Sequence, residues 1–140
     1  MMSKFGRRIE VIYCDDIRQE LGSKFSYMGI YGSDLVLPSF PVTLPKLCIA
    51  VKVVTDIDHP FDELEVVVLQ GDEQEVILGT GQIPMPAQDV FSEDGSKVIV
   101  VQTFLMLSPF QLDRETTLRV KAKTGSKDLN GLALRIKTIA

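Results

Sequence analysis

The feature that most constrains the fold is an alternation of apolar and polar residues with a period of two. It is clearest in TLRVKAK, residues 117–123, where Leu118, Val120 and Ala122 alternate with basic residues. Successive side chains of a β-strand point to opposite faces of the sheet, so this segment predicts a strand with one buried and one solvated face. No segment sustains the 3.6-residue period of an amphipathic helix. The pattern therefore predicts an all-β protein.

Further segments with strand patterns are separated by turn residues at regular spacing. The expected strands are residues 8–14, 24–31, 46–55, 63–70, 75–81, 97–107, 117–123 and 132–139. Many short strands with regularly spaced turns are typical of a β-sandwich. We therefore expect a single-domain β-sandwich of about eight mostly antiparallel strands, spanning residues 1–140.

Several connections can also be predicted. Gly71-Asp72 between two strand patterns predicts a hairpin. The proline-rich segment 37–45 cannot be a central strand, so we expect an extended crossing between the sheets. Residues 97–107 are apolar on both faces and should form a central strand. The last two expected strands should pair as a hairpin, with Leu132, Leu134 and Ile136 facing the core.

The segment CDDIRQELG places Asp15, Asp16 and Glu20 around Arg18. It fits a short helix that ends at its glycine, and it equally fits the end of one strand and the turn into the next. We favour one helical turn or an irregular corner between two antiparallel strands. Charge pairs between Arg18 and the neighbouring acids would hold this structural corner, and contact with a partner or ligand is the alternative.

The same segment carries a resemblance. CDDIRQELGSKFSYMGIYG, followed by LVLPSFPVTLPKLCIAV, resembles a family of small bacterial and prophage-encoded proteins with a domain of unknown function. The shared features are the pattern CDD-x-R-x-E-x-G-x-K-x-S-x-x-G-x-Y and a proline-rich crossing. The resemblance is specific over residues 11–55 and diffuse beyond them. It implies a single β-sandwich-like domain and a bacteriophage or prophage origin, and it assigns no catalytic residue.

Residues that commonly carry catalysis are scarce. His59 is the one histidine and precedes a proline, as is typical of a loop. Any Cys–His or Ser–His pair would have to use it. Cys14 and Cys48 lie in apolar strand patterns, where we expect them to be reduced and buried. We therefore expect no catalytic site, no cofactor and no enzymatic activity.

The loop 56–63 contains Asp56, Asp58, Asp62 and Glu63, which are oxygen ligands of the kind that calcium prefers. The spacing is not that of an EF-hand, and His-Pro interrupts it. Acidic loops of an acidic protein are usually just solvated. We expect no metal site, and a calcium- or ligand-binding β-sandwich that uses this loop is kept as an alternative.

The charge distribution is uneven. The formal net charge is −4, which makes nucleic acid an unlikely partner because phosphate binding needs a basic footprint. Residues 56–75 hold eight acids and no Lys or Arg, whereas residues 114–140 hold seven bases and two acids. Pairing of the last two strands would place five bases on one outer surface: Arg119, Lys121, Lys123, Arg135 and Lys137. This basic strip is a candidate interaction surface, although the solvated face of any strand carries charge.

Several expected strands carry apolar residues on both of their faces. These residues are Met28, Ile30, Val67, Leu69, Ile99, Val101 and Leu105. A sandwich covers one face of each sheet, so crossing loops, a partner or a second copy must cover the other. We therefore predict a non-enzymatic protein-interaction or self-associating module, with a phage structural component as a further alternative. No apolar run reaches the length of a membrane helix and no targeting signal is evident, so we expect a cytoplasmic protein without membrane contact.

Overall fold

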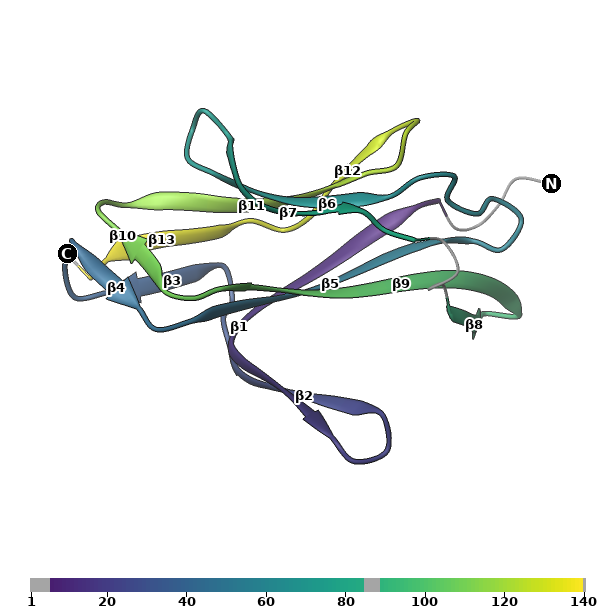
Figure 1. The fold of residues 1–140 in the computed structure, drawn as a ribbon, viewed down its shortest axis with the longest axis horizontal. Coiled ribbons are helices and arrows are strands. Elements are labelled where there is room, and N and C mark those ends of the chain that lie inside the picture. Colours follow the sequence, from purple (N-terminus) through teal and green to yellow (C-terminus); the bar gives the residue numbers. More distant parts are fainter. Residues whose placement is uncertain (1–5, 85–88, 140) are drawn as a thin grey trace.

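The structure is a computed structural model that describes residues 6–84 and 89–139. Over these residues the chain forms thirteen strands and no helix. Figure 1 shows two layers of strands, with a small pair of strands at one end and a hairpin projecting from one layer. The expected all-β, sandwich-like fold is confirmed.

Two large sheets and one small sheet make up the fold. The first has the order β2-β1-β5-β9-β8, and we call it the β5 sheet. Its strands are β1 (Arg8–Glu20), β2 (Lys24–Ile30), β5 (Leu47–Asp56), β8 (Asp89–Glu93) and β9 (Ser96–Leu107). The second, the β11 sheet, has the order β3-β13-β11-β6-β7, with β12 paired to the end of β11. Its strands are β3 (Asp34–Leu37), β6 (Glu65–Gln70), β7 (Glu75–Gln82), β11 (Thr116–Lys123), β12 (Asp128–Asn130) and β13 (Leu134–Thr138). The small sheet pairs β4 (Val42–Leu44) with β10 (Phe110–Leu112).

The strand count exceeds the expected eight because five short strands were not predicted. These are β3, β4, β8, β10 and β12, each of three to five residues. A strand this short shows too few alternations to be recognised in the sequence. Pairing is antiparallel throughout both sheets except between β13 and β3, which are parallel.

The alternation places one face of each large sheet in a shared core. In β11 the buried residues are Leu118, Val120 and Ala122, as the pattern predicted. Strand β5 lies in the middle of its sheet and is buried on both faces, and Lys52 is its one exposed residue. The second sheet packs against one face of β5, and Cys48, Ala50 and Val54 on the other face are also buried.

Two predicted connections and one predicted interior strand are confirmed. The β6–β7 hairpin turns at Gly71-Asp72. The proline-rich segment joins β3 of the β11 sheet to β5 of the other sheet, so it crosses between the layers. Strand β9 lies between β5 and β8 and is therefore an interior strand.

The prediction that Leu132 faces the core is wrong, since this side chain is 75% exposed. Strand β13 begins only at Leu134, because β11 changes its partner from β12 to β13 at this point. Between the two ladders, the Gly131 N–H donates to Val120 O over 2.8 Å. The Tyr13 hydroxyl donates to Leu132 O over 2.7 Å. These bonds hold residues 131–133 outside the strand alternation.

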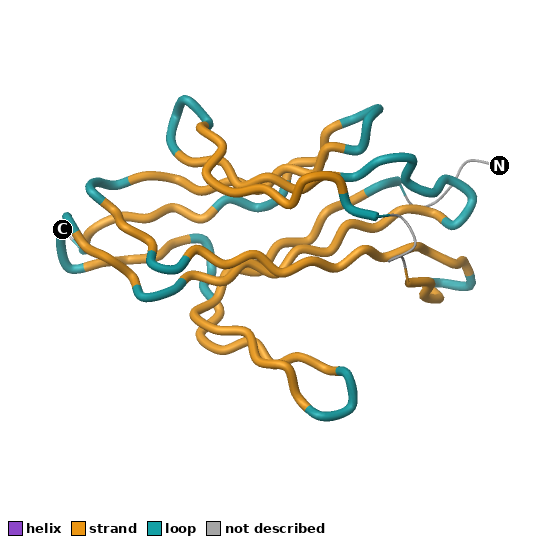
Figure 2. Tube along the Cα trace, viewed as in Figure 1, coloured by secondary structure: helices purple, strands orange, loops and turns teal. Residues whose placement is uncertain are grey.

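The favoured helical turn or irregular corner at residues 14–22 is wrong, and the alternative, the end of one strand and the turn into the next, is confirmed. Strand β1 runs without interruption to Glu20, and Leu21, Gly22 and Ser23 form the turn into β2. The first half of β1 pairs with β5 and its second half pairs with β2. Backbone pairing with β2 outweighs the local preference of Asp, Glu and Gly for helix ends. We call residues 14–30 the arm; Figure 2 shows it projecting from the two layers.

Candidate functional site

One face of the arm rests on the outer surface of the β5 sheet. The ring centroid of Phe104 in β9 lies 4.5 Å from that of Phe25 and 6.2 Å from that of Tyr27. The Gln102 amide donates to the Tyr27 hydroxyl oxygen over 2.8 Å. These aromatic contacts are of the tilted and edge-to-face kinds that aromatic pairs prefer. They fix the arm against β9.

The arm and the neighbouring surface of β9 expose several apolar side chains. Leu21 in the turn is 94% exposed, Ile30 59%, Met28 43% and Phe25 41%, and Met106 on β9 is 56% exposed. Met28 and Ile30 were singled out in the sequence as needing cover, and the described chain leaves them exposed. Val67, Leu69, Ile99, Val101 and Leu105, which were singled out with them, are buried within the chain. The sequence carried no signal for Leu21, Phe25 or Met106.

The arm also presents the least protected sheet edge. Short length, proline, charge and irregular pairing normally protect an edge strand from unwanted pairing. Strand β3 has four residues and is followed by Pro38, β7 pairs irregularly with β6, and β8 begins and ends with an acid. Strand β2 has seven residues, no proline and a single charge, Lys24, at its end. One side of the β2 backbone has no partner strand within the described residues.

The residues of the predicted charge corner are spread along the arm, from Asp15 and Asp16 at its root to Glu20 beside its turn. Asp16 Oδ1 is 2.7 Å from Lys46 Nζ, and Asp16 Oδ2 is 3.6 Å from Arg18 Nε. The hydrogen bond from Lys46 is the main reason that the pKa of Asp16 lies below its ordinary value. The Tyr31 hydroxyl donates to Asp15 Oδ1.

Glu20 sits opposite Lys24 in the β1–β2 register. Asp16 therefore connects the arm to Lys46 before β5, and Glu20 belongs to the last residue pair of the β1–β2 ladder before the turn.

The five bases of the predicted strip share the outer face of the β11 sheet, since Thr117 on β11 is opposite Arg135 on β13. They do not form one free surface. Arg135 Nε and Lys137 Nζ lie 2.8 and 3.1 Å from the two carboxylate oxygens of Asp34 on β3. The hydrogen bond from Lys137 is the main cause of a lowered Asp34 pKa.

The three bases on β11 have different surroundings. Lys123 is opposite Glu65 on β6, and Lys121 Nζ lies 4.0 Å from Asp128 Oδ2. Much of the charge asymmetry seen along the sequence is thus neutralised between neighbouring strands. Arg119 and Lys121 also line a pocket on the outer face.

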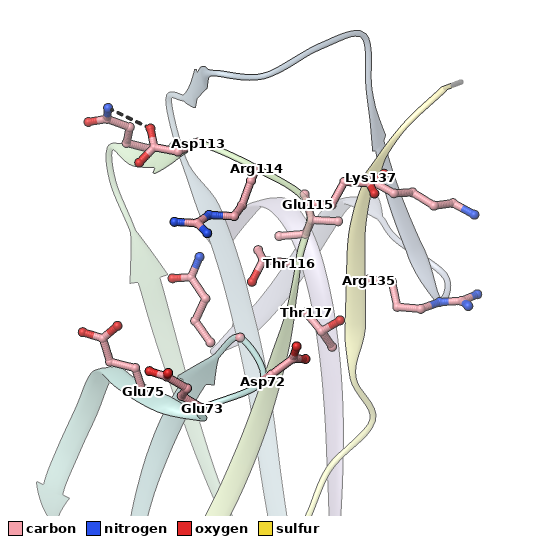
Figure 3. Close-up of a pocket in the computed structure, with 14 residues that line it drawn as sticks. Asp72, Glu73, Glu75, Asp113, Arg114, Glu115, Thr116, Thr117, Arg135 and Lys137 are labelled. Atoms are coloured by element: carbon pink, nitrogen blue, oxygen red, sulfur yellow. Dashed lines mark hydrogen bonds between the residues drawn. The ribbon is translucent and has the colours of Figure 1, made fainter.

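A pocket of about 880 Å³ opens beside the start of β11. Asp72, Glu73 and Glu75 border it from the β6–β7 turn, and Asp113 and Glu115 from the loop before β11. Figure 3 shows Arg114 pointing into the space between Asp113 and the acidic turn, whereas Arg135 and Lys137 point away. The lining contains no Cys, His or Ser. Arg135 and Lys137 were predicted as part of the basic strip, and the other residues that line this pocket were not predicted as part of a site.

The loop 56–63 is organised by hydrogen bonds and an arginine. The Thr55 hydroxyl donates to His59 O over 2.8 Å, and Arg7 Nη2 donates to Pro60 O over 3.1 Å. The Arg7 guanidinium also lies 4.8 Å from the centroid of the Phe61 ring. In residues 6–84 and 89–139, no three His, Cys, Asp or Glu side chains come together as metal ligands. The calcium alternative gains no support from this geometry.

The two cysteines face each other across adjacent strands. Cys14 on β1 is opposite Cys48 on β5, and both thiols are free and buried. Burial raises the pKa of Cys14 to about 11 and also raises that of Cys48. The prediction that both cysteines are buried is confirmed, and the thiolate form needed for nucleophilic attack is disfavoured.

The fold and its surface define a class of protein: a small all-β sandwich that carries a projecting β-hairpin with exposed apolar side chains. Within the part of the chain that the structure describes, no helix is long and apolar enough to cross a membrane. Residues 10–137 match a protein family of unknown function, DUF6941, and the chain belongs to that family. No curated protein and no solved structure matches the chain.

Proposed function

We propose that this protein is a non-enzymatic interaction module that associates with a second copy of itself through the arm. The observation that carries this proposal is the unprotected edge of β2, flanked by the exposed apolar side chains of Phe25, Met28 and Ile30. The exposed loop position of His59 and the buried thiols of Cys14 and Cys48 support a role without nucleophilic catalysis.

A second copy is the occupant that best fits this edge. Two identical edge strands can pair antiparallel across a two-fold axis, and each then satisfies the backbone groups of the other. In such a pair, Lys24 at one end of β2 lies near the Ile30 end of the other copy. The two ammonium groups are therefore kept apart, and like charges do not oppose the pairing. Strand addition of this kind would also cover part of the apolar arm surface.

A structural component of a phage particle is a second candidate. It is favoured by the resemblance of residues 11–55 to prophage-encoded proteins, and self-association is a property that such a component requires. In this case the arm contact would join copies in pairs, and other surfaces of the chain would join the pairs into an assembly, because a two-fold contact is closed.

Light scattering of the purified chain at low and high salt tests the proposal. We expect twice the chain mass at both salts, because backbone pairing and apolar burial are not screened by ions. The double variant Met28→Lys/Ile30→Lys should reduce the mass to that of one chain, since it places new like charges along the contact. The matched control is Val36→Lys/Val76→Lys, which changes two similarly exposed valines on the edges of the β11 sheet.

A wild-type mass of one chain at both salts, at concentrations up to the millimolar range, would overturn the proposal. So would an oligomer that dissociates at high salt and does not respond to the Met28/Ile30 variant. That second result would assign the contact to charged surfaces instead of the arm.

A further inference from the structure

A second, smaller pocket lies on the outer face of the β11 sheet. Figures 1 and 2 show the β6–β7 and β11–β12 hairpin ends rising from this face, on the side away from the β5 sheet. The pocket has a volume of about 340 Å³. It is lined by Leu69, Gln74, Arg119, Val120, Lys121, Asn130 and Gly131.

The strand register explains why these residues meet. Arg119 is opposite Leu69 of β6, and Lys121 is opposite Asn130 of β12. Gln74 comes from the β6–β7 turn, where its φ of 52° directs the chain back toward the sheet. Leu69 is buried and forms an apolar floor. Two carboxamides and two cations from three separate segments thus surround one small space.

The charge of this pocket is incompletely balanced. Arg119 forms no ion pair with any residue of the ranges 6–84 and 89–139. Lys121 is 4.0 Å from the half-exposed carboxylate of Asp128, which is at the limit of an ion pair. Among the five bases of the strip, Arg135 and Lys137 are held by Asp34 and lie outside the pocket. Arg119, the base of this pocket without an ion-pair partner among the described residues, therefore lies in the concave part of the surface.

We infer that this pocket binds a small molecule that carries a carboxylate or phosphate group. A guanidinium pairs with either oxyanion through two parallel hydrogen bonds, and the lysine adds a point charge. The Gln74 and Asn130 amides supply donors for the remaining oxygens. The volume is at the lower end of the range for small-molecule sites, so it suits a compact anion. This inference is independent of the arm and of self-association.

Calorimetric titration with inorganic phosphate and with succinate tests the inference, with sodium chloride at equal ionic strength as the reference. We expect saturable binding of at least one probe. Arg119→Gln should weaken that binding roughly tenfold or more, as expected when a charged hydrogen-bonding partner is removed. Lys121→Gln should weaken it less. Lys123→Gln is the matched control, because Lys123 is on the same strand face but outside the pocket.

Binding of phosphate alone would assign a tetrahedral oxyanion, and binding of succinate alone a carboxylate. The inference is overturned if neither probe binds saturably, if chloride produces the same heat, or if Arg119→Gln binds as tightly as the wild type. Gln74→Gly provides a second variant, because glycine accepts the positive φ of position 74 and the substitution leaves strand β11 unchanged. It should weaken binding without changing the solution mass, which separates this test from the test of the arm.

Discussion

At the scale of single residues, Gly131 shows how closely the chain packs where β11 changes partner. A Cβ atom at this position would overlap Val11 Cγ2 and would lie 3.3 Å from Val120 O. Val11 belongs to the β5 sheet and Val120 to the β11 sheet, so Gly131 lies where both layers approach the chain. The absence of a side chain is what permits the Gly131 N–H to reach Val120 O.

Gly131→Ala should therefore destabilise the protein by about 1–3 kcal/mol, the usual cost of overpacking a well-packed region. Urea unfolding followed by circular dichroism measures this change in the free energy of unfolding. Gly32→Ala is the control, because nothing lies within 4 Å of the added atom and φ is not left-handed there. We expect a change of less than about 1 kcal/mol for the control. Equal effects of the two substitutions would contradict the close approach at Gly131.

At the scale of elements, β1 belongs to two structures at once. Residues Arg8–Cys14 are part of the sandwich through their pairing with β5, and Cys14–Glu20 form the arm with β2. The arm contacts the body mainly through Phe104, the Gln102–Tyr27 hydrogen bond and the Lys46–Asp16 ion pair. Such a hairpin with few buried contacts should open independently of the core.

Phe104→Ala should loosen the arm, because it removes the ring against which Phe25 and Tyr27 pack. An aromatic pair contributes about 0.5–1.5 kcal/mol, so amide exchange in Lys24–Ile30 should accelerate roughly 2- to 12-fold relative to β11. Hydrogen exchange followed by mass spectrometry measures both segments in one sample. Met106→Ala, on the same face of β9 but largely exposed, is the control. Unchanged exchange in the arm of the Phe104 variant would show that these ring contacts do not hold it.

At the scale of the whole molecule, two carboxylates join distant segments. Asp34 connects β3 to β13, and Asp16 connects the arm to the start of β5 through Lys46. The pKa of each is lowered, chiefly by a hydrogen bond from a lysine. Because the folded pKa lies below the unfolded value, the unfolded chain binds protons first as the solution is acidified. The stabilisation is present above the ordinary pKa of about 3.9 and is lost as the pH falls through the lowered value.

The urea concentration at the midpoint of unfolding should therefore fall as the pH is lowered below about 4, and it should fall less steeply in Asp34→Asn. That variant should also be less stable than the wild type at pH 7, because Arg135 and Lys137 lose their partner. Asp94→Asn changes an exposed turn residue with a positive φ, which asparagine accepts, and should retain the wild-type profile. Identical profiles for the wild type and Asp34→Asn would contradict the assignment.

Prediction from sequence succeeded where a segment is long and half buried. Strands β5, β9 and β11 and the β6–β7 hairpin follow from alternation and turn residues, because solvent exclusion acts on every second side chain. It failed at residues 14–22, where backbone pairing with β2 overrides helix-end residues, and at Leu132, which lies between two ladders. The residues Gln74 and Asn130 of the small pocket carry no sequence signal, since they are ordinary turn and strand-end residues.

By itself the sequence determined that the protein is all-β and which residues of its long strands enter the core. Both follow from a period-two pattern that acts over neighbouring residues. Only the tertiary structure decided that the arm projects, that Asp34 neutralises Arg135 and Lys137, and that Arg119 faces a pocket. These outcomes depend on strand order and register between segments far apart, such as Asp34 and Arg135, which are 101 residues apart. No local pattern encodes which distant strand becomes a neighbour, because that choice minimises the free energy of the whole chain.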